Sequence, residues 1–428
     1  MMKKIKEKKI RSAVIGLGYV GLPLAVEFAK AGIEVVGIDL DASKVDAIRR
    51  KKSYIRDVAA ADVAELVSQG LLSATTAYSA LSGVDTVNIC VPTPLRKTKE
   101  PDISYIVQSA EEIARYLKKG QLIILESTTY PGTTEEVLLP MFEAKGFKAG
   151  RDFYLAFSPE RVDPGNRKYQ TKNIPKVVGG VTPAFTAAAK ALYEHAVDTV
   201  HPVSSTRVAE TVKLLENTFR SVNIGLVNEL ALMCHKMDIN VWEVIDAAKT
   251  KPFGFMAFYP GPGLGGHCIP IDPLYLSWKA RVYGFEARFI ELAAQVNGAM
   301  PEYVVAKVAD ALNAHGKSIK GARILILGVA YKKNVGDYRE SPAFDVMEDL
   351  LRKGAKVTYS DPYVPSFEHM QLKMKSVRLA PAMLKQADCV VLITDHDCFD
   401  DEMIVKHVRL IVDTRNAVKV RSSKVVKL

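Results

Sequence analysis

The sequence contains no hydrophobic run that would span a membrane. No apolar stretch among its 428 residues approaches the roughly 20 residues that a membrane-spanning helix needs. The lysine-rich residues 1–11 also lack the apolar core and the small-residue cleavage site of a signal peptide. These absences lead us to expect a cytoplasmic protein without a membrane partner.

Cysteine is also scarce, and its spacing excludes two kinds of site. The number of cysteines is odd and no pair has CxxC spacing, so we expect neither a disulfide framework nor a zinc site, and no bound metal. One of the cysteines therefore remains available as a reactive thiol. The five are Cys90, Cys234, Cys268, Cys389 and Cys398.

The charge balance is basic but spread out. The formal net charge is +10, from 58 Lys and Arg residues against 48 Asp and Glu residues. The one dense basic run is the N-terminal tail, which we expect to be solvated, so no nucleic-acid partner is expected. A basic balance also suits a small anionic substrate, such as one that carries a diphosphate.

The length favours two or three domains, and no repeat or low-complexity segment interrupts the chain. From Arg11 onward, apolar runs alternate with helical patterns, which predicts βαβ units and a parallel sheet. Strands are predicted at residues 12–15, 34–40, 86–91, 122–126 and 154–157, and a helix at residues 22–31.

The pattern becomes helical after about Val203. Within residues 204–236, apolar residues recur mostly three or four apart, at Val208, Val212, Leu215, Phe219 and Val222. Helical character continues over residues 241–248, and a glycine- and proline-rich loop follows at 252–273. A further helix is predicted over residues 289–312, with a kink or break at Pro301.

An alternating pattern returns from Gly321, with strands predicted at residues 323–327, 356–360, 389–394 and 410–413, and a helix at 343–353. The expected fold class is therefore α/β, with two Rossmann-like doubly wound domains joined by a central helical domain. We place the three domains at residues 1–203, 204–315 and 316–428.

A glycine motif indicates a dinucleotide site in the first domain. Gly16, Gly18 and Gly21 lie between a predicted strand and a predicted helix, where they suit a tight turn, close approach to a pyrophosphate and close helix packing. Asp39 ends the next strand, where a carboxylate accepts hydrogen bonds from both ribose hydroxyls. Because a 2′-phosphate would meet that charge, the expected cofactor is NAD rather than NADP.

Hydroxyl residues follow two further strands of the same domain, in residues 91–94 and 127–129. Strand ends hold the ligands of doubly wound sheets, so Thr93 and Thr128 are candidates for contact with the cofactor or an ordered water. Taken singly, each is more typical of an ordinary turn or cap.

Cys268 differs from the other cysteines because it follows a loop with four glycines, at positions 261, 263, 265 and 266. Such a loop brings backbone N–H groups near a ligand and leaves a thiol accessible, and a thiolate attacks aldehydes readily. We interpret His267 as structural or substrate-contacting, since neighbouring side chains of extended chain point apart. Asp272 suits either the orientation of a water or the start of a turn.

Two polar groups outside this loop have both a catalytic and an ordinary explanation. Lys213 and Asn217 are four residues apart on one helix face, where they would stabilise an oxyanion or lie in solvent. Glu160, in the segment Ser158-Pro-Glu160-Arg161 at a strand end, is a general base or a surface acid.

With these residues identified, the chain from about Arg11 to about Val418 resembles the UDP-glucose/GDP-mannose dehydrogenase family. The motifs that carry the resemblance keep the family's order and spacing. They are residues 16–21, 91–94, 127–128, 158–160, 213–217, 265–272 and 332–340. The resemblance implies an NAD-binding domain, a central helical domain that carries a homodimer contact, and a C-terminal domain that helps to bind a UDP-sugar.

The resemblance also implies a role for each motif residue. Cys268 is the expected nucleophile, Lys213 and Asn217 polarise the reacting oxygen, Asp272 and Thr128 hold a catalytic water, and Glu160 is the base for thioester hydrolysis. The expected cofactor-binding residues are Gly16, Gly18, Tyr19, Val20, Gly21, Asp39, Lys44, Thr93, Thr128 and Arg339. The expected substrate-binding residues are Glu160, Arg161, Val162, Lys213, Asn217, Tyr259, Gly261, Gly265, Lys332 and Arg415.

The implied reaction is a four-electron oxidation of a primary alcohol to a carboxylate, with two NAD consumed per sugar, as in polysaccharide biosynthesis. Residues 160–166 and 258–263 look most like the subgroup that acts on UDP-N-acetylglucosamine. UDP-N-acetylmannosamine, UDP-N-acetylgalactosamine and UDP-glucose remain alternatives.

Two other classes of protein are compatible with part of the pattern. A two-electron hydroxy-acid dehydrogenase also pairs a dinucleotide domain with a helical one, but it needs neither Cys268 nor a third domain. A non-enzymatic NAD-sensing protein would need neither Cys268 nor Lys213. The presence of these features favours the nucleotide-sugar dehydrogenase.

Overall fold

The computed structural model describes the chain except residues 56, 96–99, 164–165, 167, 267–268 and 371. Its contacts divide the chain into two compact units. Unit 1 comprises Met1–Glu216 and Leu274–Phe285, and unit 2 comprises Asn217–Pro273 and Glu286–Leu428. In the described part of the chain, no helix is long and apolar enough to cross a membrane.

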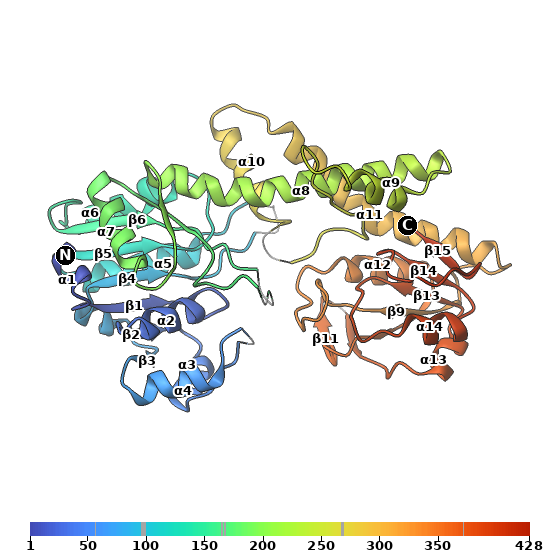
Figure 1. The fold of residues 1–428 in the computed structure, drawn as a ribbon, viewed down its shortest axis with the longest axis horizontal. Coiled ribbons are helices and arrows are strands. Elements are labelled where there is room, and N and C mark those ends of the chain that lie inside the picture. The colour runs from blue at the N-terminus through green and yellow to red at the C-terminus, as the bar shows by residue number, and fades with distance from the viewer. Residues whose placement is uncertain (56, 96–99, 164–165, 167, 267–268, 371) are drawn as a thin grey trace. The chain divides into compact units, whose positions relative to one another are not determined.

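Unit 1 is built on an eight-stranded sheet in the order β3-β2-β1-β4-β5-β6-β7-β8 (Figure 1). All neighbouring strands pair in parallel except β6 and β7, which are antiparallel. The strands are β1 (Arg11–Ile15), β2 (Glu34–Ile38), β3 (Leu72–Thr75), β4 (Thr86–Ile89), β5 (Gln121–Leu125), β6 (Phe153–Phe157), β7 (Lys176–Gly180) and β8 (Val200–Pro202).

Helices cover both faces of this sheet, as expected for parallel strands that are apolar on both sides. Alternate residues of β1 and β2 divide between two hydrophobic clusters, with Val14 and Val35 in one and Ala13 and Val36 in the other. The first cluster packs against α1 (Met2–Lys6), α2 (Gly21–Lys30), α3 (Ala42–Arg49), α4 (Ala60–Ser68) and α7 (Pro183–Tyr193). The second packs against η1 (Tyr78–Gly83), α5 (Ser104–Tyr116), η2 (Thr134–Leu138) and α6 (Leu139–Glu143).

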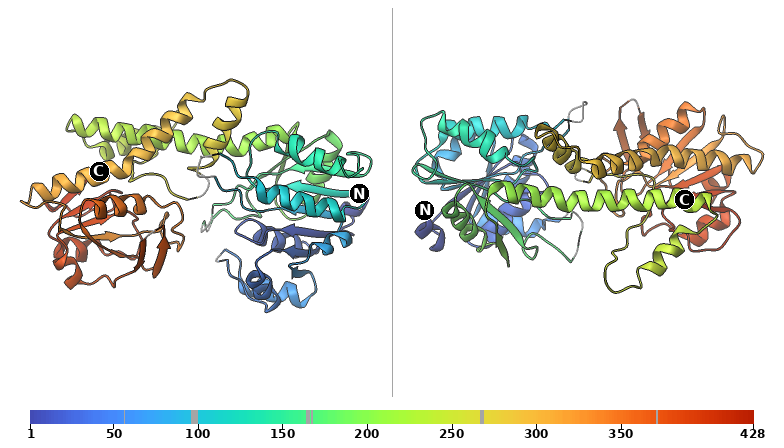
Figure 2. Two further views of the ribbon diagram at one scale, coloured as in Figure 1. Left: turned by 180° about the vertical axis from the view of Figure 1, so that it is seen from behind. Right: turned by 90° about the horizontal axis from the view of Figure 1, so that it is seen from above.

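Unit 2 contains a second, five-stranded parallel sheet in the order β10-β9-β13-β14-β15 and a separate antiparallel pair, β11-β12. These strands are β9 (Arg323–Leu327), β10 (Lys356–Ser360), β11 (Ser366–His369), β12 (Leu372–Lys375), β13 (Cys389–Leu392), β14 (Ile411–Asp413) and β15 (Val425–Lys427). One face packs on α11 (Arg288–Asn313) and α12 (Pro342–Arg352) and the other on α13 (Pro381–Gln386) and α14 (Asp401–His407), so this sheet is also buried on both sides (Figure 2).

Four helices follow the first sheet in the chain: α8 (Thr206–Lys236), α9 (Val241–Ala248), α10 (Asp272–Val282) and α11 (Arg288–Asn313). The remaining helices are α12 (Pro342–Arg352), α13 (Pro381–Gln386) and α14 (Asp401–His407). The fold class is thus confirmed. Two α/β sheets, whose strands are parallel except for β6 and β7, are separated in the chain by a helical segment. The exact domain limits stay predictions.

The break considered at Pro301 is absent, because α11 continues through this residue. Proline removes one backbone donor from a helix, but Pro301 and Met300 are both buried, so tertiary packing holds the segment helical. The apolar stripe noted on α8 is also not its packed face, since Val208, Leu215 and Phe219 are exposed.

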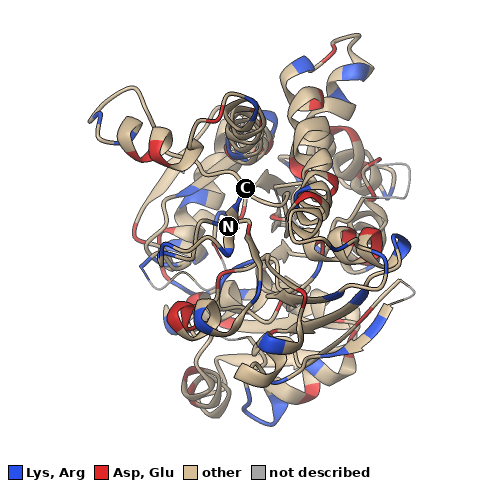
Figure 3. Cartoon of the chain, turned by 90° about the vertical axis from the view of Figure 1, so that its right-hand side faces the viewer, with Lys and Arg blue, Asp and Glu red and all other residues tan. Residues whose placement is uncertain are grey.

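Several short elements were not identified from the sequence, among them β7, β8, β15 and the β11-β12 hairpin. They are three to five residues long, and all but β7, which lies between β6 and β8, are at a sheet edge or in a separate pair. Periodicity gives little signal over so few residues. The N-terminal tail begins with α1, whose Ile5 is fully buried while its lysines are exposed. Figure 3 shows basic and acidic residues intermixed over the elements seen in that view.

Candidate active site

The loop between β1 and α2 has the geometry expected of a dinucleotide-binding turn. Gly16 has a φ of +88°, and a Cβ there would lie 2.6 Å from the Cys90 carbonyl oxygen. A Cβ at Gly21 would lie 1.9 Å from the Gly16 carbonyl oxygen, so this glycine lets the helix pack on the loop. A Cβ at Gly18 would meet no described atom within 4 Å, so packing does not require glycine there. A ligand that approaches the backbone would explain it.

Asp39 lies directly after β2 and faces this loop. Its carboxylate accepts hydrogen bonds from the backbone N–H of Leu17 at 2.7 Å and from that of Asp41 at 2.9 Å. Lys44 forms an ion pair with it at 3.1 Å. The carboxylate therefore lies at the carboxyl end of β2, where a doubly wound fold binds the adenosine ribose of NAD.

The other cofactor candidates of unit 1 border the same sheet. Tyr19 is half exposed in the loop, and Val20 takes the N-cap position of α2. The carbonyl oxygen of Thr93 accepts a hydrogen bond from the Tyr275 hydroxyl at 3.0 Å. Thr128 follows β5 and is partly buried, in a segment anchored by the Ser127 hydroxyl, which donates to the Val91 carbonyl oxygen at 2.8 Å.

A buried network of charged and polar side chains supports Glu160. Lys176 forms ion pairs with Glu126 at 2.5 Å and with Glu160 at 3.4 Å. The other oxygen of Glu126 accepts hydrogen bonds from Asn88 and from the Tyr193 hydroxyl, each at 2.7 Å. Sequence analysis missed this network, although a lysine directly before the apolar residues of β7 can indicate a buried pair.

Glu160 is held as a carboxylate. Its Oε1 accepts hydrogen bonds from the backbone N–H groups of Arg161 at 2.7 Å and Val162 at 2.8 Å. Burial alone would raise the pKa of Glu160. The charge of Lys176, the two N–H groups and the charge of Lys213 together hold this pKa below its usual value. Glu160 is therefore ionised at neutral pH, as a general base must be.

Helix α8 joins these residues to a second loop. Lys213 is only 7% exposed, which excludes the solvated-face alternative. One turn earlier, the buried Glu210 accepts hydrogen bonds from the backbone N–H of Gly132 at 2.6 Å and from the N–H and hydroxyl of Thr134. Burial raises the pKa of Glu210 to about 7. Glu210 thus fixes the segment after Thr128 to the helix that carries Lys213.

Arg161 is tied to the same helix, because its guanidinium forms an ion pair with Glu216 at 2.6 Å. Unit 1 therefore brings together Glu160, Arg161, Val162 and Lys213 of the predicted site.

Unit 2 brings together a second group of predicted residues. The Asn217 side-chain amide donates a hydrogen bond to the Asp272 carboxylate, and both residues are buried. The Asn217 carbonyl oxygen accepts a hydrogen bond from Arg220, a residue that sequence analysis did not select. Asp272 begins α10, so the turn-starter explanation and a role for its carboxylate are compatible.

The glycine-rich loop before Cys268 lies against predicted substrate-binding residues. A Cβ at Gly261 would lie 2.5 Å from the Arg415 guanidinium, and a Cβ at Gly265 would lie 2.9 Å from Tyr331, the neighbour of Lys332. Close approach thus requires glycine at position 265, whereas at position 261 the contact is with the end of the flexible Arg415 side chain. Burial lowers the pKa of Arg415, whose Nε donates to the Ile393 carbonyl oxygen at 2.9 Å.

A chain of buried amides holds this loop to two helices. The Gly261 N–H donates to Asn228 at 2.9 Å, Asn228 donates to Asn297 at 2.8 Å, and Asn297 donates to the Ser221 carbonyl oxygen at 3.0 Å. The loop position is therefore determined by α8 and α11. Neither asparagine was selected from the sequence, where a polar residue within a helical pattern is read as solvent-facing.

Tyr259 and Arg339 have partners of their own. The Tyr259 hydroxyl donates to Asp246 at 2.9 Å and accepts from Lys249 at 3.0 Å. Arg339 is half exposed and makes two hydrogen bonds to the Asp337 carboxylate, at 2.9 Å and 2.7 Å.

The loop that contains Lys332 is held in place by a buried pair, Asp361 and His396. Asp361 follows β10 and accepts hydrogen bonds from His396 Nε2 at 3.0 Å and from the N–H groups of Val329 and Ala330. His396 Nδ1 accepts from the Asn334 N–H at 2.9 Å, so the imidazole proton is on Nε2. Burial alone would raise the pKa of Asp361, but these hydrogen bonds hold it below its usual value.

Two predicted residues, His267 and Cys268, lie outside the described residues. Within the described part of the chain, no group of three or more His, Cys, Asp or Glu residues is arranged to hold a metal ion.

Three family models match the chain in order. They are the NAD binding domain of the UDP-glucose/GDP-mannose dehydrogenase family at residues 10–197, its central domain at 207–299 and its UDP binding domain at 325–420. The chain belongs to the UDP-glucose/GDP-mannose dehydrogenase family.

Individual relatives agree with this assignment. The chain is 38% identical to UDP-N-acetyl-D-glucosamine 6-dehydrogenase of Pseudomonas aeruginosa. The similarity extends over 365 residues, which are 85% of each chain. It is 36% identical to UDP-N-acetyl-D-mannosamine dehydrogenase of Salmonella typhi, over 94% of this chain and 98% of the relative. The structure of UDP-D-ManNAc dehydrogenase from Pyrococcus horikoshii matches with a TM-score of 0.90 and 35% identity, over 98% of each chain.

This dehydrogenase is therefore an NAD-dependent oxidoreductase of nucleotide sugars, as the resemblance implied. The NAD-binding and UDP-binding domains support NAD as the cofactor and a UDP-sugar as the substrate. The two-electron hydroxy-acid dehydrogenase considered from the sequence is not favoured.

Proposed function

We propose that the dehydrogenase oxidises the C6 alcohol of UDP-N-acetylglucosamine to the carboxylate, with two NAD consumed per sugar. The observation that carries this proposal is the likeness of residues 160–166 and 258–263 to the subgroup that acts on this sugar. The Pseudomonas aeruginosa relative, whose name specifies this substrate, supports it.

NAD would be held by the loop of Gly16, Gly18 and Gly21 and by the Asp39 carboxylate. The open space beside Gly18 fits a pyrophosphate, and the start of α2, which has no side-chain cap, carries the positive potential of a helix N-terminus. Tyr19, Val20, Lys44, Thr93, Thr128 and Arg339 are proposed as further cofactor contacts. When bound, NAD supplies the hydride acceptor.

Substrate positioning is proposed for two groups of residues. Arg415, Gly261, Gly265, Tyr259 and Lys332 would hold the UDP moiety, since the guanidinium and ammonium groups complement a diphosphate. Glu160, Arg161, Val162, Lys213 and Asn217 would contact the sugar.

In the first oxidation, the C6 hydroxyl loses its proton and a hydride, which gives an aldehyde. Lys213 and Asn217 would stabilise the negative charge on the reacting oxygen. Helix α8 fixes the positions of both residues, which supply an ammonium and an amide donor. Asp272, oriented by its hydrogen bond from Asn217, and Thr128 would hold the water that takes the proton.

In the second oxidation, the Cys268 thiolate would attack the aldehyde carbon to form a thiohemiacetal. Loss of a second hydride leaves a thioester. Glu160 would then take a proton from a water that attacks the thioester carbon, which breaks the carbon–sulfur bond and releases the carboxylate and the thiolate. The low pKa of Glu160 keeps it ready as a carboxylate for this step.

UDP-N-acetylmannosamine is the second candidate substrate. The relatives named for that sugar match a larger share of this chain than the Pseudomonas aeruginosa enzyme does, at 94% against 85%. The two sugars differ only in the configuration at C2, so the same C6 chemistry applies to both.

Initial rates of NADH formation test the substrate. UDP-N-acetylglucosamine, UDP-N-acetylmannosamine, UDP-N-acetylgalactosamine and UDP-glucose are compared at equal concentrations, and UDP-N-acetylglucosamine is expected to give the highest kcat/KM. A preference for another of these sugars would refute the substrate assignment and leave the reaction intact. Cys268→Ser is expected to stop after the first oxidation, since serine is a poor nucleophile towards the aldehyde.

We also propose a homodimer that acts in the cytoplasm in polysaccharide biosynthesis. Support for the dimer comes from exposed large apolar side chains on α8 and α11 of unit 2, which are Phe219, Leu226, Met233, Phe289 and Leu292. Apolar surface gathered on adjacent helices favours an interface. The mass in solution tests this part.

A further inference from the structure

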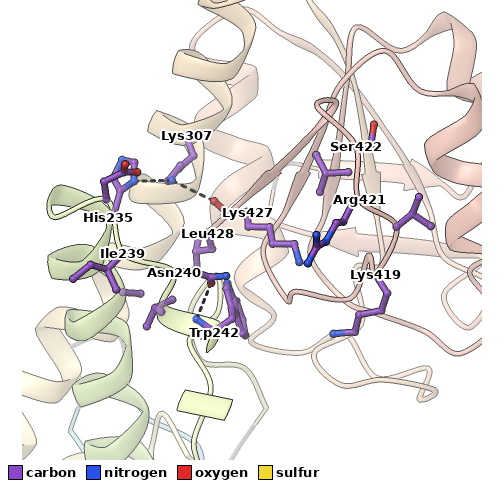
Figure 4. A pocket seen from close by; sticks show the side chains of 15 residues that line it. His235, Ile239, Asn240, Trp242, Lys307, Lys419, Arg421, Ser422, Lys427 and Leu428 are labelled. Atoms are coloured by element: carbon purple, nitrogen blue, oxygen red, sulfur yellow. Dashed lines mark hydrogen bonds between the residues drawn. The ribbon is translucent and has the colours of Figure 1, made fainter. Parts of the chain in front are cut away.

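A cavity of about 510 Å³ lies within unit 2 and shares no lining residue with the proposed active site (Figure 4). Its walls are the end of α8, the turn into α9, one residue of α11 and the C-terminal segment. The lining residues are Ala231, His235, Asp238, Ile239, Asn240, Val241, Trp242, Lys307, Lys419, Val420, Arg421, Ser422, Val425, Lys427 and Leu428.

The lining is strongly basic. Lys307, Lys419, Arg421 and Lys427 contribute four positive charges, and Asp238 is the one acidic side chain among the described lining residues. In Figure 4, Lys419 and Arg421 lie on the C-terminal segment opposite Asn240 and Trp242. Cations on two sides of one cavity create a positive potential that attracts anions.

Lys307 is the most informative of these cations, because it is buried and the only carboxylate named as acting on it, the exposed Asp310, forms no ion pair with it. It is 8% exposed, and its ammonium donates hydrogen bonds to His235 Nδ1 at 3.1 Å and to the Lys427 carbonyl oxygen at 3.2 Å. Among the described residues it forms no salt bridge, and burial lowers its pKa. A buried charge without a directly paired opposite charge is costly, so an anion in the cavity would relieve that cost.

Further hydrogen-bond donors border the cavity. The N-terminal end of α9 contributes Asn240, Val241 and Trp242, and the start of a helix carries positive potential. Trp242 is 4% exposed, and its indole nitrogen has no hydrogen-bond partner among the described residues. A buried N–H donor without an acceptor is rare in folded proteins, and a ligand oxygen would satisfy it.

We propose that this cavity binds a phosphate-bearing small anion. Several cations together with a helix N-terminus suit a multiply charged phosphate or diphosphate better than a single carboxylate. The volume exceeds that of a phosphate group, so the apolar side chains of Val241, Val425 and Leu428 leave room for an organic portion. The site is separate from catalysis, so its test does not depend on turnover.

Trp242 provides a reporter, since the chain contains only two tryptophans and the other is Trp278 in α10. In a Trp278→Phe background, we expect inorganic pyrophosphate to change the Trp242 emission in a saturable way. Equal ionic strength of KCl is the control, because general screening would act on surface charges without saturation.

Two further substitutions locate the site. Lys307→Met removes the buried charge and Arg421→Gln an exposed one, and each is expected to weaken pyrophosphate binding by roughly tenfold or more, as loss of one charge-assisted contact does. The matched control is Lys385→Gln, an exposed lysine of α13 outside the cavity, which should bind as the parent does. Because Arg421 is exposed, its variant remains informative if Lys307→Met fails to fold.

The source of the phosphate is resolved by a separate calorimetric titration with UDP. Two binding events in the parent and one in Arg421→Gln would identify a nucleotide as the ligand. A pyrophosphate response that depends on Arg421, with a single UDP event, would identify an inorganic phosphate. Absence of a saturable pyrophosphate response, or equal affinity in the parent, Lys307→Met and Arg421→Gln, would overturn the proposal.

Discussion

Each of the two sheets places a glycine after its first strand and an aspartate after its second, but the two pairs have different surroundings. In unit 1 the residues are Gly16 and Asp39, and in unit 2 they are Gly328 and Asp361. Both glycines have positive φ, +88° and +79°. Both aspartates accept backbone N–H groups of the loop after the first strand.

The difference lies in what the two loops leave accessible. Asp39 accepts one N–H of its loop, from Leu17, and its side chain is 10% exposed. Asp361 is fully buried and covered by His396. The same local structure thus serves two purposes. The partly exposed Asp39 carboxylate suits a ribose, whereas the buried Asp361 carboxylate supports the longer loop that contains Lys332.

The largest expected effect comes from replacing the glycine that follows the first strand of each sheet. Gly16→Ala and Gly328→Ala would each place a Cβ within 2.6 Å or 2.4 Å of a carbonyl oxygen, at positive φ. We expect each to lower the free energy of unfolding by about 3 kcal/mol or more, measured by denaturant titration. Gly70→Ala is the control, because it has a φ of +74° with no atom within 4 Å and should cost only about 1–2 kcal/mol. Equal losses in all three variants would contradict the close approach.

The aspartates should separate cofactor binding from stability. Asp39→Asn is expected to raise the KM for NAD by roughly 10- to 100-fold with little change in Tm, because it weakens a ribose acceptor. Asp361→Asn is expected to lower stability by about 1–3 kcal/mol and leave the KM for NAD unchanged, because an amide group would face N–H donors. The same response from both variants would remove the distinction between the two sites.

A smaller effect is expected from His396, which we interpret as a positioning residue for the Lys332 loop. His396→Leu removes both of its hydrogen bonds and should raise the KM for the UDP-sugar by about 3- to 10-fold without changing the KM for NAD. His396→Asn keeps an acceptor for the Asn334 N–H and should recover part of the loss. The counterpart in unit 1 is Tyr54→Phe, which loses a hydrogen bond to Leu17 and should affect only NAD. A His396→Leu variant with altered NAD affinity alone would contradict this role.

The smallest expected effect is the pH dependence that Glu210 contributes in unit 1. Since burial raises the pKa of Glu210 from 4.5 to about 7, the folded protein binds this proton more tightly than the unfolded chain does. The free energy of unfolding should therefore fall by about 1 kcal/mol per pH unit as the pH rises from about 4.5 to about 7. Asp361, with a lowered pKa, contributes no slope in this range. Unfolding of the parent and of Glu210→Gln across this range tests this contribution, because the slope should be smaller in the variant by that amount; equal slopes would refute it.

Much of the fold was predictable because the long elements have strong periodicity. The ranges predicted for β9, β10 and α9 agree with the structure residue for residue. The failures have local physical causes. The edge strands β8 and β15 have three residues each, too few for a pattern, and α8 buries polar residues on the face that carries Lys213 while its apolar stripe is exposed.

The site was less predictable than the fold, because contacts between distant residues leave no spacing in the sequence. The glycines of the first loop and Asp39 follow from a local motif, whereas Lys176, Glu126, Asn228 and His396 act through partners 35 to 69 residues away. The roles of Lys213 and Glu160 came from family resemblance and stay proposals.

The central claim is that this dehydrogenase carries one sugar through two successive oxidations. The most direct test is the amount of NADH formed when limiting UDP-N-acetylglucosamine is exhausted in excess NAD. The account predicts two NADH per sugar, with the C6 carboxylate as the product by mass spectrometry. One NADH per sugar with a released aldehyde, or no NADH from folded, NAD-binding protein, would contradict it.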